Sequence, residues 1–317
     1  MNSDVFYFPS ADGISRIFAR RWQPAGPPFA IVQILHGMSE HSGRYEEFAK
    51  YLAQAGLAVI AHDHIGHGKS VTEGQRYCFF AERGGWDMAL KDIERIHAIA
   101  LKQWPGLPYF MFGHSMGSFL LRSLLLTPAS AGLSGAIFSG SGNNSPIRLK
   151  LGDLLIKLER KRLGAQGLSP LLTAVVLGGY NRRFRPTRTA VDWLSNDSAV
   201  VDDYLADPLC RKLPTVGLYD DINRALAVIG KTSKIRLMDN ALPLLLLSGE
   251  NDPVGANGRA VRKLYNQFKE IGCADVNLRL YPGCRHALLY EQNRREVFAD
   301  IEDWLIKRTK TRGQEPK

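Results

Sequence analysis

Ser115 stands between two glycines in the run Gly113-His114-Ser115-Met116-Gly117, where an apolar β-rich stretch gives way to a helix-like stretch. A serine on such a sharp strand-to-helix turn presents its Oγ above a sheet, and small neighbours permit the strained backbone that the turn requires. The first amides of the following helix then lie where an oxyanion would form. These residue types at this spacing predict a nucleophilic serine. The alternative, a tight turn whose serine only caps the helix, is less consistent with the strand–helix setting.

A nucleophilic serine needs a histidine base and an acid that orients it, which follow the serine in the order acid, then histidine. Asp252 comes after the apolar run LPLLLLSGE, and His286 comes after NLRLYP. Both residues follow consecutive predicted strands, at the sheet edge where ligands gather in open α/β proteins. We therefore predict a triad of Ser115, His286 and Asp252. Glu250 is the rival acid, ranked lower because it lies inside the strand pattern.

An acyl-transfer site also requires backbone N–H donors that stabilise the oxyanion. The run His36-Gly37-Met38-Ser39-Glu40 follows another predicted strand, so that its turn is placed to supply one donor. We assign the two donors to the main-chain N–H groups of Met38 and Met116. Each is expected to contribute about 3 kcal/mol to stabilisation of the transition state.

The elements that must position these residues are strands and helices in alternation. Strands are expected at residues 5–10, 16–23, 32–37, 57–63, 109–114, 135–141, 242–250 and 277–282, with helices at 44–56, 85–104, from 116 onward and at 293–309. The alternation predicts an α/β fold with a mainly parallel, eight-stranded sheet and helices on both faces. The first two strands, separated by Asp12-Gly13, are expected to form an antiparallel hairpin at the sheet edge.

The alternation stops between Ser141 and about Asn240. That segment holds two apolar helix candidates, at 151–161 and 168–180, mixed with loops and charged residues. We expect a helical cap or lid at 142–240, inserted between core parts at 1–141 and 241–317.

The net charge of +10 raises the question of an anionic partner. Its excess is densest in residues 143–240, which carry 16 Lys and Arg against 10 Asp and Glu. No helix-turn-helix, zinc-finger or aromatic RNA-binding pattern accompanies the charge, so we expect no nucleic-acid partner. A solvated face is the simplest interpretation. Peripheral contact with an anionic membrane is the alternative, which apolar residues beside the basic ones would assist.

The compartment is suggested by the amino terminus and by cysteine usage. The first residues do not resemble a secretory signal, and no run approaches the roughly 18 apolar residues that span a bilayer. The cysteines lack CxxC spacing, which favours neither a zinc site nor a disulfide framework; they are Cys78, Cys210, Cys273 and Cys284. We expect a cytoplasmic protein.

A histidine-rich stretch, His62-Asp63-His64-Ile65-Gly66-His67-Gly68, has the composition of a metal site. Its order does not match the HxHxDH pattern of dinuclear hydrolases. We expect a structural glycine-rich loop near the site, no metal ion and no organic cofactor.

Six motifs occur in order along the chain: HGMSEHSGRY (36–45), AHDHIGHGKS (61–70), PGLP (105–108), GHSMGS (113–118), SGENDPV (248–254) and YPGCRHALLYE (281–291). Together they resemble the monoacylglycerol lipase and lysophospholipase branch of the α/β-hydrolases, which is serine aminopeptidase S33-like. The resemblance implies the same triad and the same two oxyanion donors. Ser118 departs from it, because relatives usually have glycine there. The middle segment shows no close resemblance to the eukaryotic enzymes, so acyl length and headgroup stay open.

The resemblance implies hydrolysis of a lipid ester, monoacylglycerol or lysophospholipid, through an acyl-enzyme. Glu40, Arg44 and His114 are candidate substrate-binding residues, although Glu40 and Arg44 could equally form an internal ion pair that holds their loop. Three alternatives remain. A small-molecule carboxylesterase or an S33-type peptidase would use the same chemistry, although proline iminopeptidases usually carry HGGPG where this chain has HGMSE. A non-catalytic binding protein on the same scaffold would typically lack a triad residue.

Overall fold

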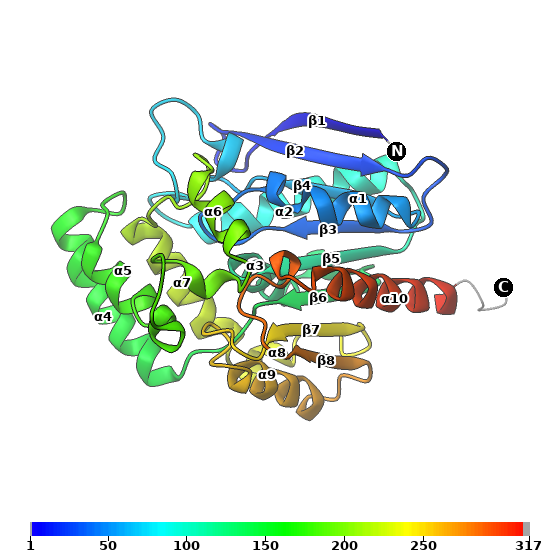
Figure 1. The fold of residues 1–317 in the computed structure, drawn as a ribbon. Helices are drawn as coiled ribbons and strands as arrows, with labels where there is room; N and C mark the ends of the chain where they lie inside the picture. The colour runs from blue at the N-terminus through cyan, green and yellow to red at the C-terminus, as the bar shows by residue number, and fades with distance from the viewer. Residues whose placement is uncertain (1, 313–317) are drawn as a thin grey trace.

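Eight strands form one sheet in the computed structural model, which describes residues 2–312 (Figure 1). Their order across the sheet is β1-β2-β4-β3-β5-β6-β7-β8. Pairs β1–β2 and β2–β4 are antiparallel and all the others are parallel. The predicted sheet and its edge hairpin are thus confirmed. The strands are β1 (Asn2–Pro9), β2 (Arg16–Gln23), β3 (Ile31–Leu35), β4 (Ala58–His62), β5 (Tyr109–His114), β6 (Gly135–Ser139), β7 (Leu244–Gly249) and β8 (Val276–Tyr281).

The central strands are buried along their whole length. Every residue of β3, β4, β5, β6 and β7 is buried, whereas β1 is exposed at most positions. Continuous apolar runs are expected where helices cover both faces of a parallel sheet. This explains why the inner strands were predictable from the sequence as uninterrupted apolar segments.

Two hydrophobic clusters occupy the two faces of the sheet. One cluster includes residues of α2 (Gly85–Gln103), α3 (Met116–Leu124) and α9 (Arg259–Glu270). The other includes residues of α1 (Glu46–Gln54) and α10 (Arg294–Arg312). The sheet is therefore covered on both sides, as an α/β fold requires.

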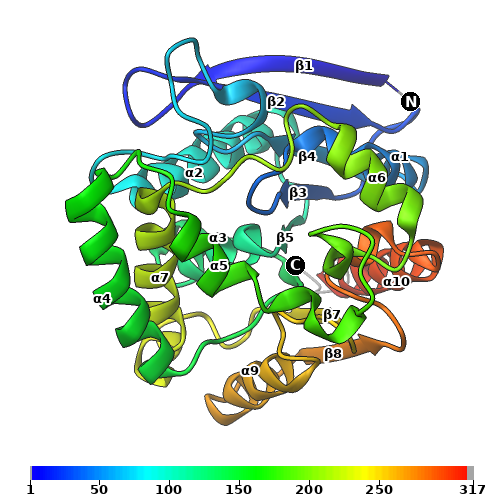
Figure 2. The same cartoon turned by 60° about the vertical axis from the view of Figure 1, so that its left-hand side comes forward.

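The long segment between β6 and β7 contains α4 (Pro146–Leu163), α5 (Pro170–Leu177), α6 (Ser198–Ala206), α7 (Val216–Ile229) and α8 (Thr232–Ile235). Helices α4 to α7 lie beyond the C-terminal ends of the parallel strands (Figures 1 and 2). Within this segment α7 contributes Leu218, Ala225, Leu226 and Ile229 to the core cluster of α2 and α3, whereas α4 contributes Leu149. The segment coincides with the insertion expected at 142–240, whose role as a cap stays a prediction.

No helix within residues 2–312 is both long enough and apolar enough to cross a membrane.

Candidate active site

Ser115 lies between the last residue of β5 and the first residue of α3, with φ of 50° and ψ of −119°. This is a strained conformation for a residue with a side chain. The turn also needs both flanking glycines. A Cβ added to Gly117 would lie 2.1 Å from the carbonyl oxygen of Leu35, and one added to Gly113 would lie 2.5 Å from the carbonyl oxygen of Gly117. The close approach of α3 to β3 and β5 thus dictates the G-x-S-x-G pattern.

His286 and Asp252 meet although they are separated by 34 residues. The distance between His286 Nδ1 and Asp252 Oδ1 is 2.9 Å, and both side chains are buried. Asp252 follows β7 and His286 follows β8, which are neighbours in the sheet. Asp252 Oδ1 also accepts a hydrogen bond from the backbone N–H of Val254 at 2.8 Å. The rival acid, Glu250, is exposed.

The imidazole of His286 is packed on several sides. Its ring centroid lies 4.7 Å from that of His114 and 5.1 Å from that of Trp193. Gly140, which has a φ of 61°, lies against the ring, since a Cβ there would be 2.8 Å from His286 Cε1. Burial, followed by the nearby His286, lowers the pKa of His114 to about 4. His114 is therefore neutral near pH 7.

The candidate oxyanion turn is fixed by Glu40. The N–H of Gly37 donates to Glu40 Oε1 at 2.5 Å, so this donor is already used. Met38, the next residue, lines the cavity in front of Ser115, and Met116 is the first residue of α3. The N–H of a first helical residue has no partner within its own helix. Met38 and Met116 thus remain the proposed pair of donors.

Glu40 and Arg44 form a buried ion pair, with 3.2 Å between Arg44 Nε and Glu40 Oε2. Glu40 Oε1 also accepts a hydrogen bond from the Tyr45 hydroxyl at 2.6 Å. The guanidinium of Arg44 lies over the rings of Tyr204 and Tyr290, 4.8 Å and 4.4 Å from their centroids. Burial alone would raise the pKa of Glu40, but the charge of Arg44, together with His114, His36 and the Tyr45 hydroxyl, lowers the pKa to about 2. This geometry matches the internal ion pair, although both residues also line the cavity.

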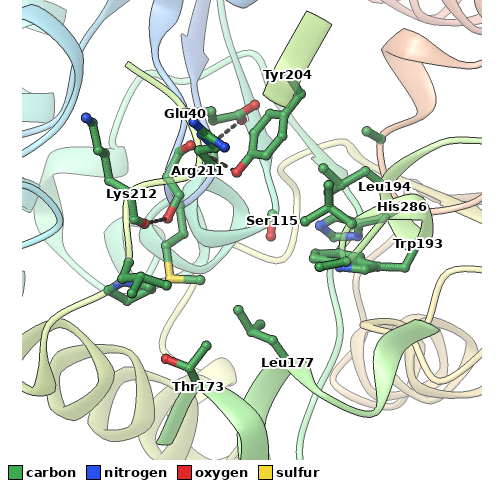
Figure 3. Close-up of a pocket in the computed structure, with 18 of the residues that line it drawn as sticks. Glu40, Ser115, Thr173, Leu177, Trp193, Leu194, Tyr204, Arg211, Lys212 and His286 are labelled. Carbon is green, nitrogen blue, oxygen red and sulfur yellow. Dashed lines mark hydrogen bonds between the residues drawn. The ribbon is translucent and has the colours of Figure 1, made fainter. Parts of the chain in front are cut away.

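A cavity of about 520 Å³ opens in front of Ser115 and His286 (Figure 3). Its wall is largely apolar and comes from α5 and the segments on either side of α6. The apolar wall residues include Pro170, Ala174, Leu177, Val191, Trp193, Leu194, Leu213 and Pro214. Cavities of this size and character bind small apolar ligands.

The histidine-rich stretch forms a buried cluster behind the site. Rings of His36 and His64 have centroids 4.2 Å apart, and those of His62 and His64 lie 4.7 Å apart. Burial lowers the pKa of His36 and of His62 to about 3, so both are neutral. Asp63 instead accepts hydrogen bonds from the backbone N–H groups of Ser42 and Lys69, at 2.8 Å and 2.7 Å. The stretch thus holds loops together, as expected of a structural element.

One group of donors has a metal-like composition: the ligand atoms of His41, Asp207 and Cys210 lie within 4.8 Å of one another. His41 Nδ1 accepts a hydrogen bond from the N–H of Gly43 at 3.1 Å. His41 Nε2 therefore carries the proton and donates to Asp207 at 2.8 Å. This contact joins the EHSGRY loop to the end of α6, and the nearby guanidinium of Arg44 disfavours a further cation.

The chain is similar to several known proteins. Residues 26–293 match the family described as serine aminopeptidase, S33. The chain is 32% identical over 315 residues to human monoglyceride lipase, covering 98% of this chain and 93% of the relative. It is 29% identical over 306 residues to a monoacylglycerol lipase of Mycolicibacterium smegmatis, covering 94% and 95%. Its structure resembles a thermostable carboxyl esterase from Bacillus coagulans solved in complex with glycerol, with a TM-score of 0.90, 30% identity and coverage of 98% and 99%.

Proposed function

The chain belongs to the serine aminopeptidase S33 family of α/β-hydrolases, and from this premise we propose that it is a serine esterase that hydrolyses lipid esters, with monoacylglycerol as its substrate. The observation that carries the proposal is that Ser115 and His286, whose Nδ1 is hydrogen-bonded to Asp252, both line a largely apolar cavity of about 520 Å³. A polar reaction centre beside an apolar wall suits an ester of a long acyl chain with a small alcohol.

The proposed reaction proceeds in two steps. His286 accepts the proton of Ser115 Oγ while the oxygen attacks the ester carbonyl, and the N–H groups of Met38 and Met116 stabilise the oxyanion. The acyl-enzyme forms when His286 protonates the leaving alcohol. Water activated by His286 then releases the fatty acid. Asp252 holds the imidazole through Nδ1 and stabilises its charged form, at the 2.9 Å distance given above.

A second candidate substrate is a lysophospholipid, which two basic residues favour. Arg211 and Lys212 line the same cavity. Neither forms an ion pair with an acidic side chain among the residues that the structure describes, whereas Glu40 and Arg44 neutralise each other. The Lys212 ammonium lies over the Tyr77 ring, 4.8 Å from its centroid, so Arg211 is the cation better placed to meet a phosphate beside the ester.

Access from a lipid surface is part of the proposal, and α4 supports it. Four apolar side chains recur on α4 and are exposed to 72%, 64%, 58% and 58%: Ile147, Leu151, Leu154 and Leu158. Lysines 150, 157 and 161 lie in the same helix. A helix with these features docks on anionic membranes. We expect co-sedimentation with anionic vesicles that weakens at high salt, and Leu154→Ser/Leu158→Ser should reduce it. Binding that does not depend on salt would contradict docking driven by charge.

The deciding experiment measures fatty-acid release from 1-monooleoylglycerol and from 1-oleoyl-lysophosphatidylcholine, with wild type and Ser115→Ala in parallel. The proposal expects faster release from monooleoylglycerol and none with Ser115→Ala. Faster release from the phospholipid would favour the second candidate. Activity on neither, with p-nitrophenyl acetate still cleaved, would leave a simple esterase. Absence of labelling by a fluorophosphonate probe would contradict the proposed nucleophile.

A further inference from the structure

Arg122 is a buried cation in the helix that follows the nucleophile. It lies in α3, two turns after Ser115, and only 3% of it is exposed. Its guanidinium donates four hydrogen bonds, to Ser141 Oγ (3.4 Å), the Gly142 carbonyl (2.9 Å), Asn143 Oδ1 (2.6 Å) and the Ile229 carbonyl (3.0 Å). Burial lowers its pKa to about 9, with no carboxylate contributing in the described part of the chain. It therefore stays charged at neutral pH.

The partners of Arg122 lie at the two ends of the α4–α7 segment. Gly142 and Asn143 belong to the loop that leaves β6 for α4, and Ile229 is the last residue of α7. The network continues through Asn143 Nδ2, which donates to Gln267 Oε1 of α9 at 2.7 Å. Gln267 Nε2 in turn donates to the carbonyl of Gly230 at 3.4 Å. One side chain on the nucleophile helix thus joins both connections between the inserted helices and the sheet.

The loop at residues 140–143 also contacts the rest of the triad. Gly140 lies against the ring of His286, where a Cβ would be 2.8 Å from Cε1. A Cβ on Gly142 would be 3.0 Å from the carbonyl oxygen of Val254, whose N–H is bonded to Asp252. A shift of this loop would therefore change the surface against which His286 packs. It would also displace Val254, whose N–H donates to Asp252.

We propose that Arg122 is a positioning residue that clamps the 140–143 loop and the end of α7 to the helix that follows Ser115. It thereby sets both the surface against which His286 packs and the position of the α5 wall of the acyl cavity. The proposal rests on the proposed esterase function. The planar guanidinium is needed because it reaches several carbonyl acceptors at once in a fixed fork. An ammonium at the end of a flexible chain cannot satisfy them in the same geometry.

The test compares Arg122→Lys and Arg122→Met with wild type on p-nitrophenyl acetate and on monooleoylglycerol. Rates are divided by the concentration of sites that react with a fluorophosphonate probe, so that unfolded protein does not count. We expect kcat per reactive site to fall on the order of 10- to 100-fold with both substrates, as for other small misplacements of catalytic groups. KM should rise for monooleoylglycerol and not for p-nitrophenyl acetate, because only the long acyl chain contacts the α5 wall of the cavity.

Ser123→Ala is the matched control, because it removes a different α3 hydrogen bond, from Trp86 Nε1 at 3.0 Å, and leaves the loop untouched. It should lower stability without changing kcat per reactive site. If the Arg122 variants do not fold, Asn143→Ala removes one arm of the same network and should show the same pattern more weakly. Kinetics within twofold of wild type per reactive site would reduce Arg122 to a stability role. If wild type cleaves only the short ester, the proposed lipid function fails, while the kcat comparison on p-nitrophenyl acetate still tests Arg122.

Discussion

Replacing Glu40 by glutamine removes one buried charge and leaves the shape of the side chain nearly intact. The variant keeps an oxygen for the N–H of Gly37 and the Tyr45 hydroxyl, but it leaves the guanidinium of Arg44 buried without its carboxylate. Removing one partner of a buried ion pair typically costs about 3–5 kcal/mol. The folded-state pKa of about 2, against the ordinary 4.5, corresponds to roughly 3 kcal/mol. We therefore expect Glu40→Gln to lower the free energy of unfolding by about 3 kcal/mol at pH 7.

The pH dependence of this loss has a definite sign. Because the pKa of Glu40 is depressed by folding, its contribution is present above the unfolded pKa of 4.5 and is lost as the pH falls through 2. The difference between wild type and Glu40→Gln should therefore be constant from pH 7 to pH 5. It should fall to about half near pH 3.

Urea unfolding of both proteins at pH 7, 5 and 3 measures this difference. Arg44→Met and the double variant complete a cycle, in which the double variant should recover much of the loss. A difference below about 1 kcal/mol at pH 7, or one that does not change between pH 5 and pH 3, would refute the reasoning.

The ratio of monoacylglycerol to lysophospholipid hydrolysis by Glu40→Gln separates a role of Glu40 in substrate binding from a role in holding its loop. An unchanged ratio would limit Glu40 to holding its loop.

Four further substitutions test the site. Asp252→Asn should lower kcat about 10⁴-fold, because the imidazole loses its orienting carboxylate. Glu250→Gln should leave kcat unchanged. Equal effects of the two substitutions on ester hydrolysis would contradict the choice of Asp252 as the acid. Gly140→Ala should lower kcat by at least about 10², since its Cβ would lie 2.8 Å from His286 Cε1, and wild-type kinetics would contradict that contact. Ser118→Gly removes a 2.6 Å hydrogen bond to the carbonyl oxygen of Ser115. It should lower the free energy of unfolding, measured by thermal unfolding, by about 1 kcal/mol with kcat retained. A loss of activity would instead assign Ser118 a part in catalysis.

The strands and the order of the candidate triad could be read from the sequence because both depend on local patterns. Asp252 follows β7, an inner strand that is a continuous apolar run, and His286 follows β8, an edge strand whose residues alternate. Their meeting at 2.9 Å then follows from the pairing of β7 with β8. The local turn at Ser115 was equally visible, because its glycines are required by backbone contacts. The catalytic roles of these residues stay predictions until activity is measured.

Other features depend on partners distant in the chain and left no local signal. Nothing near Arg122 in the sequence indicates that its guanidinium meets Gly142 and Ile229. The helices α7 and α9 were not predicted, although a signal existed. In α9 the apolar residues recur at helical spacing, and α7 is capped by Thr215, whose hydroxyl accepts a hydrogen bond from the N–H of Leu218. Around α7, the mixture of charged residues and loops obscured the helical signal.

The placement of the inserted helices has a consequence for synthesis of the chain. Strands β6 and β7 are hydrogen-bonded neighbours, yet residue 139 ends one and residue 244 begins the other. At roughly 5–20 residues per second, a ribosome needs roughly 5–20 s to add the intervening segment. During that interval the outer edge of β6 has no partner strand, and an unpaired edge invites association with other chains. The length of the insertion therefore sets how long the edge of β6 stays unpaired during synthesis, and this interval grows when the insertion is longer or translation is slower.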